Sequence, residues 1–121
     1  MKILLTGANG YVSRRLLPEL LLLGHEVVCA VRDKNRLGID DETLQKISIW
    51  EVDFTKPYEE TAILNGVDIA YYMIHSMSTS IGDFDELEKS SAKNFNKYLD
   101  NSTIKQVIYL SGIVNNNSLS K

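Results

Sequence analysis

The residues best suited to chemistry in this chain form a glycine-containing loop near its start. Gly7 and Gly10 come after the apolar run Ile3-Leu4-Leu5 and before a leucine-rich segment of helical spacing. Glycines permit a tight turn, and a helix that begins directly afterwards points unpaired N–H groups and its positive dipole end at an anion. The spacing predicts a loop that binds the pyrophosphate of a dinucleotide, with Ser13 at the third glycine position, whose role is helix packing.

A cluster of basic side chains stands where the adenosine ribose of a dinucleotide would lie. Arg32 follows the second apolar run, and Lys34 and Arg36 come shortly after it. At this position an acid binds a free 2′-hydroxyl, whereas a base binds a 2′-phosphate, for which the planar guanidinium is well suited. The cluster favours NADP(H) over NAD(H). A solvated loop would carry the same charges, and Asp33 keeps NAD(H) open.

Two further strand ends carry candidates for binding the rest of the ligand. Asp53 could accept a hydrogen bond from the adenine amino group while Phe54 covers the ring, or Asp53 could cap the following turn. His75 and Ser76 come after the fourth apolar run, beside the point where the strand order reverses, and could line the nicotinamide ribose. His75 could instead be a structural histidine with one ring nitrogen bonded to a carbonyl.

The elements that must position these residues follow a repeated β-α-β pattern. Short apolar runs rich in β-branched residues alternate with longer segments of helical spacing. Strands are predicted over 2–6, 26–31, 47–52, 69–74 and 104–110, and helices over 11–23, 40–46, 58–64 and 83–99. Right-handed crossovers between parallel strands then give an α/β fold: a three-layer, Rossmann-like parallel sheet of five strands in order 3-2-1-4-5, with helices on both faces.

Two of the predicted helices have a clear apolar face. In helix 11–23 that face carries Val12, Leu16, Leu20 and Leu23. In helix 83–99 the inward positions are Phe84, Leu87, Ser91, Phe95 and Tyr98, and the opposite face carries Glu86, Lys89, Lys93 and Lys97. Asp83 is the predicted N-cap of the second helix.

Composition excludes several classes of function. The 121 residues are 44% hydrophobic and 24% charged, as is typical of one globular domain. A formal charge of -3 gives no overall positive field that would favour nucleic acid. The leucine cluster at 16–23 is too short to span a bilayer, so we expect no membrane partner and a cytoplasmic location. Cys29 is predicted to be a buried, inert strand residue, and one cysteine with two separated histidines makes no zinc site.

Segments that match a known family occur in order along nearly the whole chain. They are Leu5–Val12, Gly24–Val27, Ala30–Arg32, Val52–Phe54, Gly66–Asp68, His75–Met77 and Ile108–Ser111. On these segments the chain resembles the N-terminal part of an atypical or extended short-chain dehydrogenase/reductase, in the NAD(P)-binding, NmrA-like and NAD-dependent epimerase/dehydratase group. The resemblance implies an NAD(P)(H) cofactor and a parent activity of oxidoreductase or epimerase/dehydratase.

The resemblance also implies roles for individual residues. The pyrophosphate would be bound by Gly7, Asn9, Gly10, Tyr11 and Val12. Arg32 would bind the 2′-phosphate, Asp53 and Phe54 would bind adenine, and His75 and Ser76 would lie near the ribose and nicotinamide. Ser111, at the end of the fifth strand, would correspond to the serine that polarises a substrate carbonyl or hydroxyl in active members.

One departure from the family pattern bears on catalysis. Active members use a Tyr-x-x-x-Lys pair after the fifth strand to move the proton that accompanies hydride transfer, and no tyrosine follows Tyr109 here. We therefore expect residues 1–121 to form a single NAD(P)-binding domain, truncated relative to the full family, with a polar tail at 115–121 and no catalysis by itself. The small-molecule substrate is not identified. The alternative is a regulatory, redox-sensing or self-associating protein that uses exposed sheet edges or helix 83–99.

Overall fold

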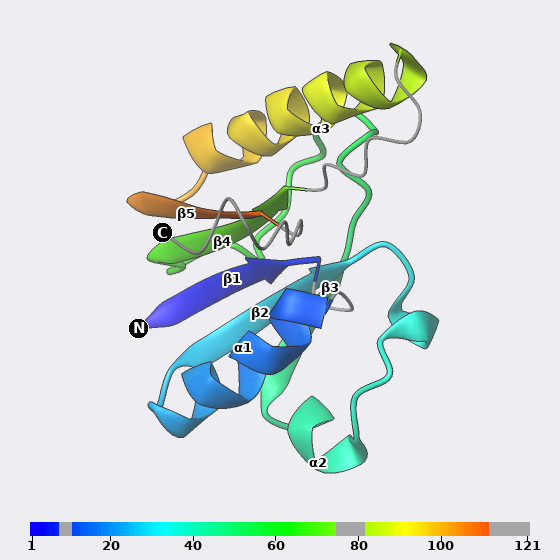
Figure 1. Cartoon of the computed structure of the whole chain (residues 1–121). Coiled ribbons are helices and arrows are strands. Elements are labelled where there is room, and N and C mark those ends of the chain that lie inside the picture. The colour runs from blue at the N-terminus through cyan, green and yellow to red at the C-terminus, as the bar shows by residue number, and fades with distance from the viewer. Residues whose placement is uncertain (8–10, 75–81, 112–121) are drawn as a thin grey trace, which may run out of the picture.

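The computed structural model describes residues 1–7, 11–74 and 82–111. The strands are β1 (Lys2–Thr6), β2 (Glu26–Val31), β3 (Ile47–Glu51), β4 (Ile69–Ile74) and β5 (Gln106–Ser111). The helices are α1 (Tyr11–Leu22), the 3-10 turn η1 (Lys34–Arg36), α2 (Asp41–Leu44) and α3 (Gly82–Asp100). These elements form an α/β sandwich with the sheet as its middle layer (Figure 1).

The five strands make one sheet in which every neighbouring pair is parallel. Their order is β3-β2-β1-β4-β5, which confirms the predicted order. The central strands are apolar on both sides, and the side chains of Val27–Val31 are all at most 3% exposed. Such continuous apolar runs are typical of parallel sheets that are covered on both faces. Because the strands are parallel, their carboxyl ends lie along one edge of the sheet.

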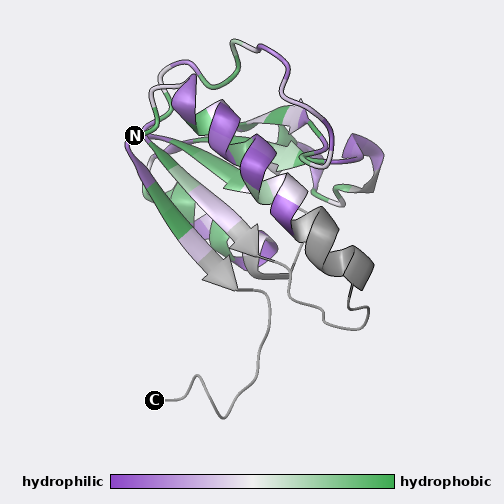
Figure 2. Ribbon diagram, turned by 90° about the horizontal axis from the view of Figure 1, so that it is seen from above, coloured by the Kyte–Doolittle hydropathy of each residue, from purple (hydrophilic) through white to green (hydrophobic). Residues whose placement is uncertain are grey.

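Alternate residues of the central strands enter two separate cores, one on each face. Ile3 and Leu5 pack with residues of α1, whereas Leu4 between them packs with residues of α3. This alternation follows from the period of two along a strand. The two helices therefore lie on opposite faces of the sheet (Figure 1), and the visible side of the coloured part of α3 is mostly hydrophilic (Figure 2).

Helix α1 buries a stripe that differs from the predicted one. Ser13, Leu17 and Leu20 are buried at spacings of four and three residues, whereas Leu23, predicted to face the core, is 71% exposed. The prediction for Leu23 was wrong because the stripe formed by Ser13, Leu17 and Leu20 would next pass through position 24, so Leu23 lies beside it where the helix ends. Gly24 then adopts a φ of 88°, which turns the chain towards β2.

The core on the α3 face is mainly aromatic. The ring of Phe54 meets the rings of Trp50, Phe95 and Tyr98 edge to face, at centroid distances of 5.7, 5.3 and 5.7 Å. The ring of Phe95 also stacks on that of Tyr72 at 4.3 Å. Each such pair adds about 0.5–1.5 kcal/mol to the free energy of burial. These contacts attach the segment that follows β3 to both α3 and β4.

No helix forms over 58–64, where the sequence predicted one. The N–H of Glu59 donates to the hydroxyl of Tyr98 at 3.1 Å, and the N–H of Ile63 donates to the hydroxyl of Thr61 at 3.2 Å. The Thr61 hydroxyl thus accepts a hydrogen bond from the N–H of Ile63, which a helix would have used in its own ladder. The segment is held as a loop by these bonds.

Several element boundaries also differ from the predicted ones by one or two residues. Strand β5 begins at Gln106 rather than at 104, because the N–H of Ile104 bonds to the Ser102 hydroxyl at 3.2 Å instead of joining the sheet. Helix α3 begins at Gly82, so Asp83 lies inside its first turn and is not the N-cap. The short helix predicted over 40–46 is confirmed as α2, with Asp40 as its N-cap.

Candidate functional site

The predicted binding residues that the structure describes gather at the carboxyl ends of β1, β2 and β3. Gly7 comes directly after β1, Arg32 directly after β2, and Asp53 with Phe54 just after β3. The registers align these ends, since Thr6 pairs with Ala30 and Val31 pairs with Glu51. Ligands of open parallel sheets bind at this edge, beside the point where the strand order reverses. Here that point lies between β1 and β4.

The remaining predicted residues are only partly covered by the structure. Tyr11 and Val12 form the start of α1, and Ser111 ends β5 with its backbone paired to Ile74; nothing is described of these three side chains. Asn9, Gly10, His75 and Ser76 lie outside the described residues.

The entry to the glycine loop is fixed from two sides. The Thr6 hydroxyl donates to the carbonyl of Tyr71 in β4 at 3.0 Å, and the buried Ser13 hydroxyl donates to the carbonyl of Thr6 at 3.1 Å. Ser13 thus fills the third glycine position and still lets α1 pack against β1. Gly7 has a φ of 59°, in the left-handed region that favours glycine. The loop therefore leaves β1 in a conformation that a β-branched residue would strain.

The segment that carries the basic residues is held by its own carboxylate and by β3. Arg32 and Lys34 are exposed, whereas the Asp33 carboxylate accepts a hydrogen bond from the N–H of Asn35 at 3.0 Å and caps η1. The N–H of Lys34 donates to the carboxylate of Glu51 at 3.1 Å. The Oδ1 atom of Asp33, the residue that kept NAD(H) open, is therefore engaged in the structure of the turn.

A third support for this segment comes from α1. Arg14 lies in the first turn of α1, and its Nη2 donates to the carbonyl of Leu37 at 3.2 Å. Leu37 is 2% exposed and packs in the core on the α1 face. We did not predict Arg14 or Glu51 from the sequence. The available signal was that each lies within four residues of a predicted binding residue: Arg14 follows Gly10 of the pyrophosphate loop, and Glu51 precedes Asp53 of the adenine site.

Asp53 occupies the turn-capping arrangement that the sequence allowed. Its Oδ1 accepts hydrogen bonds from the N–H and the hydroxyl of Thr55, at 2.9 and 2.6 Å. Partial burial opposes ionisation, but these two bonds, with smaller contributions from the charges of Arg32 and Lys56, lower the pKa of Asp53 below its usual value. The charge of Arg32 is therefore close enough to act on Asp53.

The lowered pKa gives a pH-dependent contribution to stability. The ionised carboxylate of Asp53 stabilises the fold fully above the unfolded pKa of about 3.9, and this contribution is lost as the pH falls through the lower folded pKa. We expect Asp53→Asn to lower the urea midpoint at neutral pH and to differ less from wild type at about pH 3. Glu60→Gln, at an exposed loop position, controls for loss of a carboxylate. A difference that stays constant with pH would contradict the assignment.

Asp53 also lines a hollow beside the end of β3. The hollow has a volume of about 590 Å³, and its lining includes Trp50, Glu51, Lys56 and Tyr58. Phe54, the other predicted adenine residue, is half-buried and is not part of this lining, because its ring packs in the aromatic core on the α3 face. The carboxylate of Asp53 gives this hollow a hydrogen-bond acceptor, which suits a ligand that carries a hydrogen-bond donor.

Other chemistry finds little support among the described residues. Burial raises the pKa of the Cys29 thiol to about 12, so this thiol is not a nucleophile at neutral pH. Over 1–7, 11–74 and 82–111, no three His, Cys, Asp or Glu side chains are grouped so as to hold a metal ion. No helix in the same part of the chain is both long and apolar enough to cross a membrane.

Comparison with known protein families identifies the family to which the chain belongs. A family model described as NAD(P)H-binding matches residues 7–120. The chain belongs to this NAD(P)H-binding family. The match includes the glycine loop, the basic segment and every strand after β1. No curated protein matches this member of the family.

Solved structures share the fold of this NAD(P)H-binding chain. A Lactobacillus casei protein is 26% identical with a TM-score of 0.60, over 89% of this chain and 47% of its own. A putative NAD-dependent epimerase/dehydratase from Bacillus halodurans is 24% identical with a TM-score of 0.68, over 98% and 55%. Candida albicans Gre2 in complex with NADPH is 16% identical with a TM-score of 0.66, over 90% and 36%. The chain thus spans 36–55% of the length of these three structures.

Proposed function

We propose that the chain binds NADP(H) in preference to NAD(H), at the carboxyl ends of β1, β2 and β3. The observation that carries this proposal is the exposed Arg32 at the end of β2, on a segment whose own carboxylate, Asp33, caps η1. An acid that binds a ribose 2′-hydroxyl must face the ligand, whereas a guanidinium there binds a 2′-phosphate in a bidentate manner. Membership of the NAD(P)H-binding family supports the dinucleotide.

The other contacts follow from where the residues lie along this edge. In the proposed complex Gly7 and Gly10 let the backbone approach the pyrophosphate, with Asn9, Tyr11 and Val12 beside them. The Oδ2 atom of Asp53 accepts a hydrogen bond from the adenine amino group. Both hydrogen bonds from Thr55 go to the other carboxylate oxygen, Oδ1. Phe54 covers the ring edge, and His75 and Ser76 line the nicotinamide ribose.

The parent activity that we propose is that of an NAD(P)-dependent oxidoreductase or epimerase/dehydratase. When bound, the nicotinamide supplies or accepts a hydride, and the residues of this chain bind and orient it. Ser111, at the end of β5, is the proposed contact for a substrate carbonyl or hydroxyl oxygen. A general acid such as the Tyr-x-x-x-Lys pair does not follow β5 in residues 112–121. We therefore propose that these 121 residues bind the cofactor without completing the reaction.

Direct titration tests the binding proposal. Trp50 is the single tryptophan, lies in β3 and itself lines the hollow beside Asp53. Its fluorescence should change on addition of NADPH, and calorimetry should give a lower Kd for NADPH than for NADH. If neither dinucleotide binds at millimolar concentration, the proposal fails. Tighter binding of NADH would overturn the proposed preference alone.

Replacing Arg32 with alanine should weaken NADPH binding by about 30-fold, because a charged hydrogen-bonding group is worth about 1.5–3 kcal/mol. NADH lacks the 2′-phosphate, so its Kd should change by less than about twofold. Calorimetric titration of both dinucleotides measures the two values.

The matched control for this variant is Lys97→Ala. Lys97 is an exposed cation in the last turn of α3, far along the chain from the proposed site, and its loss changes the net charge equally. This control should leave both affinities unchanged. An equal loss of NADPH and NADH affinity in Arg32→Ala would remove the 2′-phosphate assignment.

A further inference from the structure

We infer that Arg14 is a positioning residue for dinucleotide selectivity, because it holds the segment 32–37 in the place where Arg32 and Lys34 would meet a 2′-phosphate. The inference rests on the proposed function, since it concerns the same site. Arg14 would act through the backbone of this segment and would not itself contact the ligand.

The hydrogen bond from Arg14 joins two parts of the site that are distant in sequence. Its Nη2 reaches the carbonyl of Leu37, 23 residues further along the chain, at 3.2 Å. Leu37 closes η1, because its N–H bonds to the carbonyl of Lys34 at 3.3 Å, and its side chain is buried. The far end of the basic segment is therefore attached to the first turn of α1, directly after the glycine loop.

The near end of the segment has supports of a different origin. Val31 is in the sheet, the Lys34 N–H is bonded to Glu51 of β3, and Asp33 caps the turn internally. The bond from Arg14 connects the backbone of the segment to the helix that begins at the pyrophosphate loop, and the Leu37 side chain packs in the same core as Leu17 and Leu20 of that helix. Its removal leaves the supports from β2 and β3 in place, so the segment should become looser while the domain remains folded.

Loss of affinity in an Arg14 variant could have two explanations, and comparing NADPH with NADH separates them. A positive charge on the first turn of α1 would attract the pyrophosphate, which NADPH and NADH share, so its loss would weaken both equally. A looser basic segment would weaken only the contact to the 2′-phosphate, which NADH lacks. The inference therefore predicts a change in the ratio of the two Kd values.

The binding experiment compares Arg14→Gln, Arg14→Lys and Arg15→Gln. Arg15 lies on the same turn of α1 and is exposed, so its variant makes the same change of charge without removing the bond to Leu37. Arg14→Gln should weaken NADPH binding about fivefold, as expected for one partly exposed hydrogen bond, and change NADH binding by less than about twofold. Arg14→Lys, which keeps a donor and the charge, should recover most of the loss.

Amide hydrogen exchange without any dinucleotide gives a second readout. In Arg14→Gln the amides of Lys34, Asn35 and Leu37 should exchange faster than in wild type, and in Arg14→Lys, which keeps a donor, they should exchange nearly as slowly as in wild type. Unchanged exchange in Arg14→Gln, or equal losses of NADPH and NADH affinity, would overturn the inference. If wild type binds neither dinucleotide, the proposed function fails, and the exchange rates still decide whether Arg14 holds the segment.

Discussion

Gly7→Val is expected to abolish binding of both NADPH and NADH while leaving the sheet folded. Gly7 has a φ of 59°, in the left-handed region, where a β-branched residue costs about 1–2 kcal/mol. A loss of that size is a fraction of the 5–15 kcal/mol that stabilises a typical domain. The new side chain would stand where the backbone must approach the pyrophosphate, so we expect the Kd of both dinucleotides to rise by more than about 100-fold.

Gly24→Val is the matched control for this backbone strain. Gly24 has a φ of 88°, and a Cβ placed there meets no atom within 4 Å, so the variant is strained without a clash. It lies at the amino-terminal end of β2, opposite the proposed site. Both valine variants should lower the urea midpoint by similar amounts, and only Gly7→Val should lose the dinucleotides.

A third variant, Gly7→Asn, separates the effect of backbone strain from the effect of an added side chain at the loop. Asparagine tolerates the left-handed region better than valine, so Gly7→Asn should recover stability. It still adds a side chain at the pyrophosphate, so dinucleotide binding should remain weak. Wild-type affinity in Gly7→Val would show that the dinucleotide does not bind at the end of β1. Equal loss of binding in Gly24→Val would show that the effect comes from strain alone.

The sheet could be predicted from the sequence because its signals are local. The strands β1, β2 and β4 have the predicted bounds, since continuous apolar runs between turn residues identify strands buried on both faces. Right-handed crossovers then leave few arrangements of five parallel strands. The same local reasoning placed Gly7, Arg32 and Asp53 at one edge, because every parallel strand ends there.

The features that the sequence did not predict depend on contacts between distant residues. The loop over 58–64 is held by the hydroxyl of Tyr98, 39 residues away from Glu59, and no local pattern in 58–64 indicates that partner. The bond between Arg14 and Leu37 spans 23 residues in the same way. The capping role of Asp53 was foreseen as an alternative, because its partner Thr55 is only two residues away.

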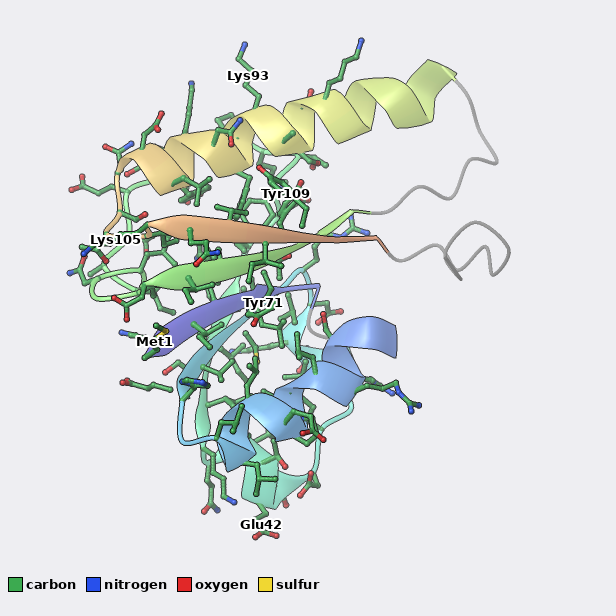
Figure 3. All side chains as sticks on the ribbon, turned by 60° about the vertical axis from the view of Figure 1, so that its left-hand side comes forward. Met1, Glu42, Tyr71, Lys93, Lys105 and Tyr109 are labelled. Atoms are coloured by element: carbon green, nitrogen blue, oxygen red, sulfur yellow. The ribbon has the colours of Figure 1, made fainter. Side chains whose placement is uncertain are left out.

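Phe95→Ala is expected to lower the free energy of unfolding by about 3–5 kcal/mol, which is typical of removing a buried aromatic ring. Phe95 is 1% exposed and joins α3 to the sheet through its stacked contact with Tyr72. Urea titration measures the loss. Lys93→Ala, two residues earlier on the same helix, is the control, because the Lys93 side chain points away from the sheet (Figure 3). It should change stability by less than about 0.5 kcal/mol.

The same variant tests whether Phe54 has a part in binding. Phe95 is one of the rings that hold Phe54, with centroids 5.3 Å apart, so its loss should loosen the proposed adenine contact as well as the core. Adenine is common to both dinucleotides, so the folded Phe95→Ala protein should lose affinity for NADPH and NADH by the same factor. Saturating NADPH should also raise its urea midpoint, since a ligand that binds only the folded state stabilises it. A change in the ratio of the two Kd values, as expected for Arg32→Ala, would contradict this role of Phe54.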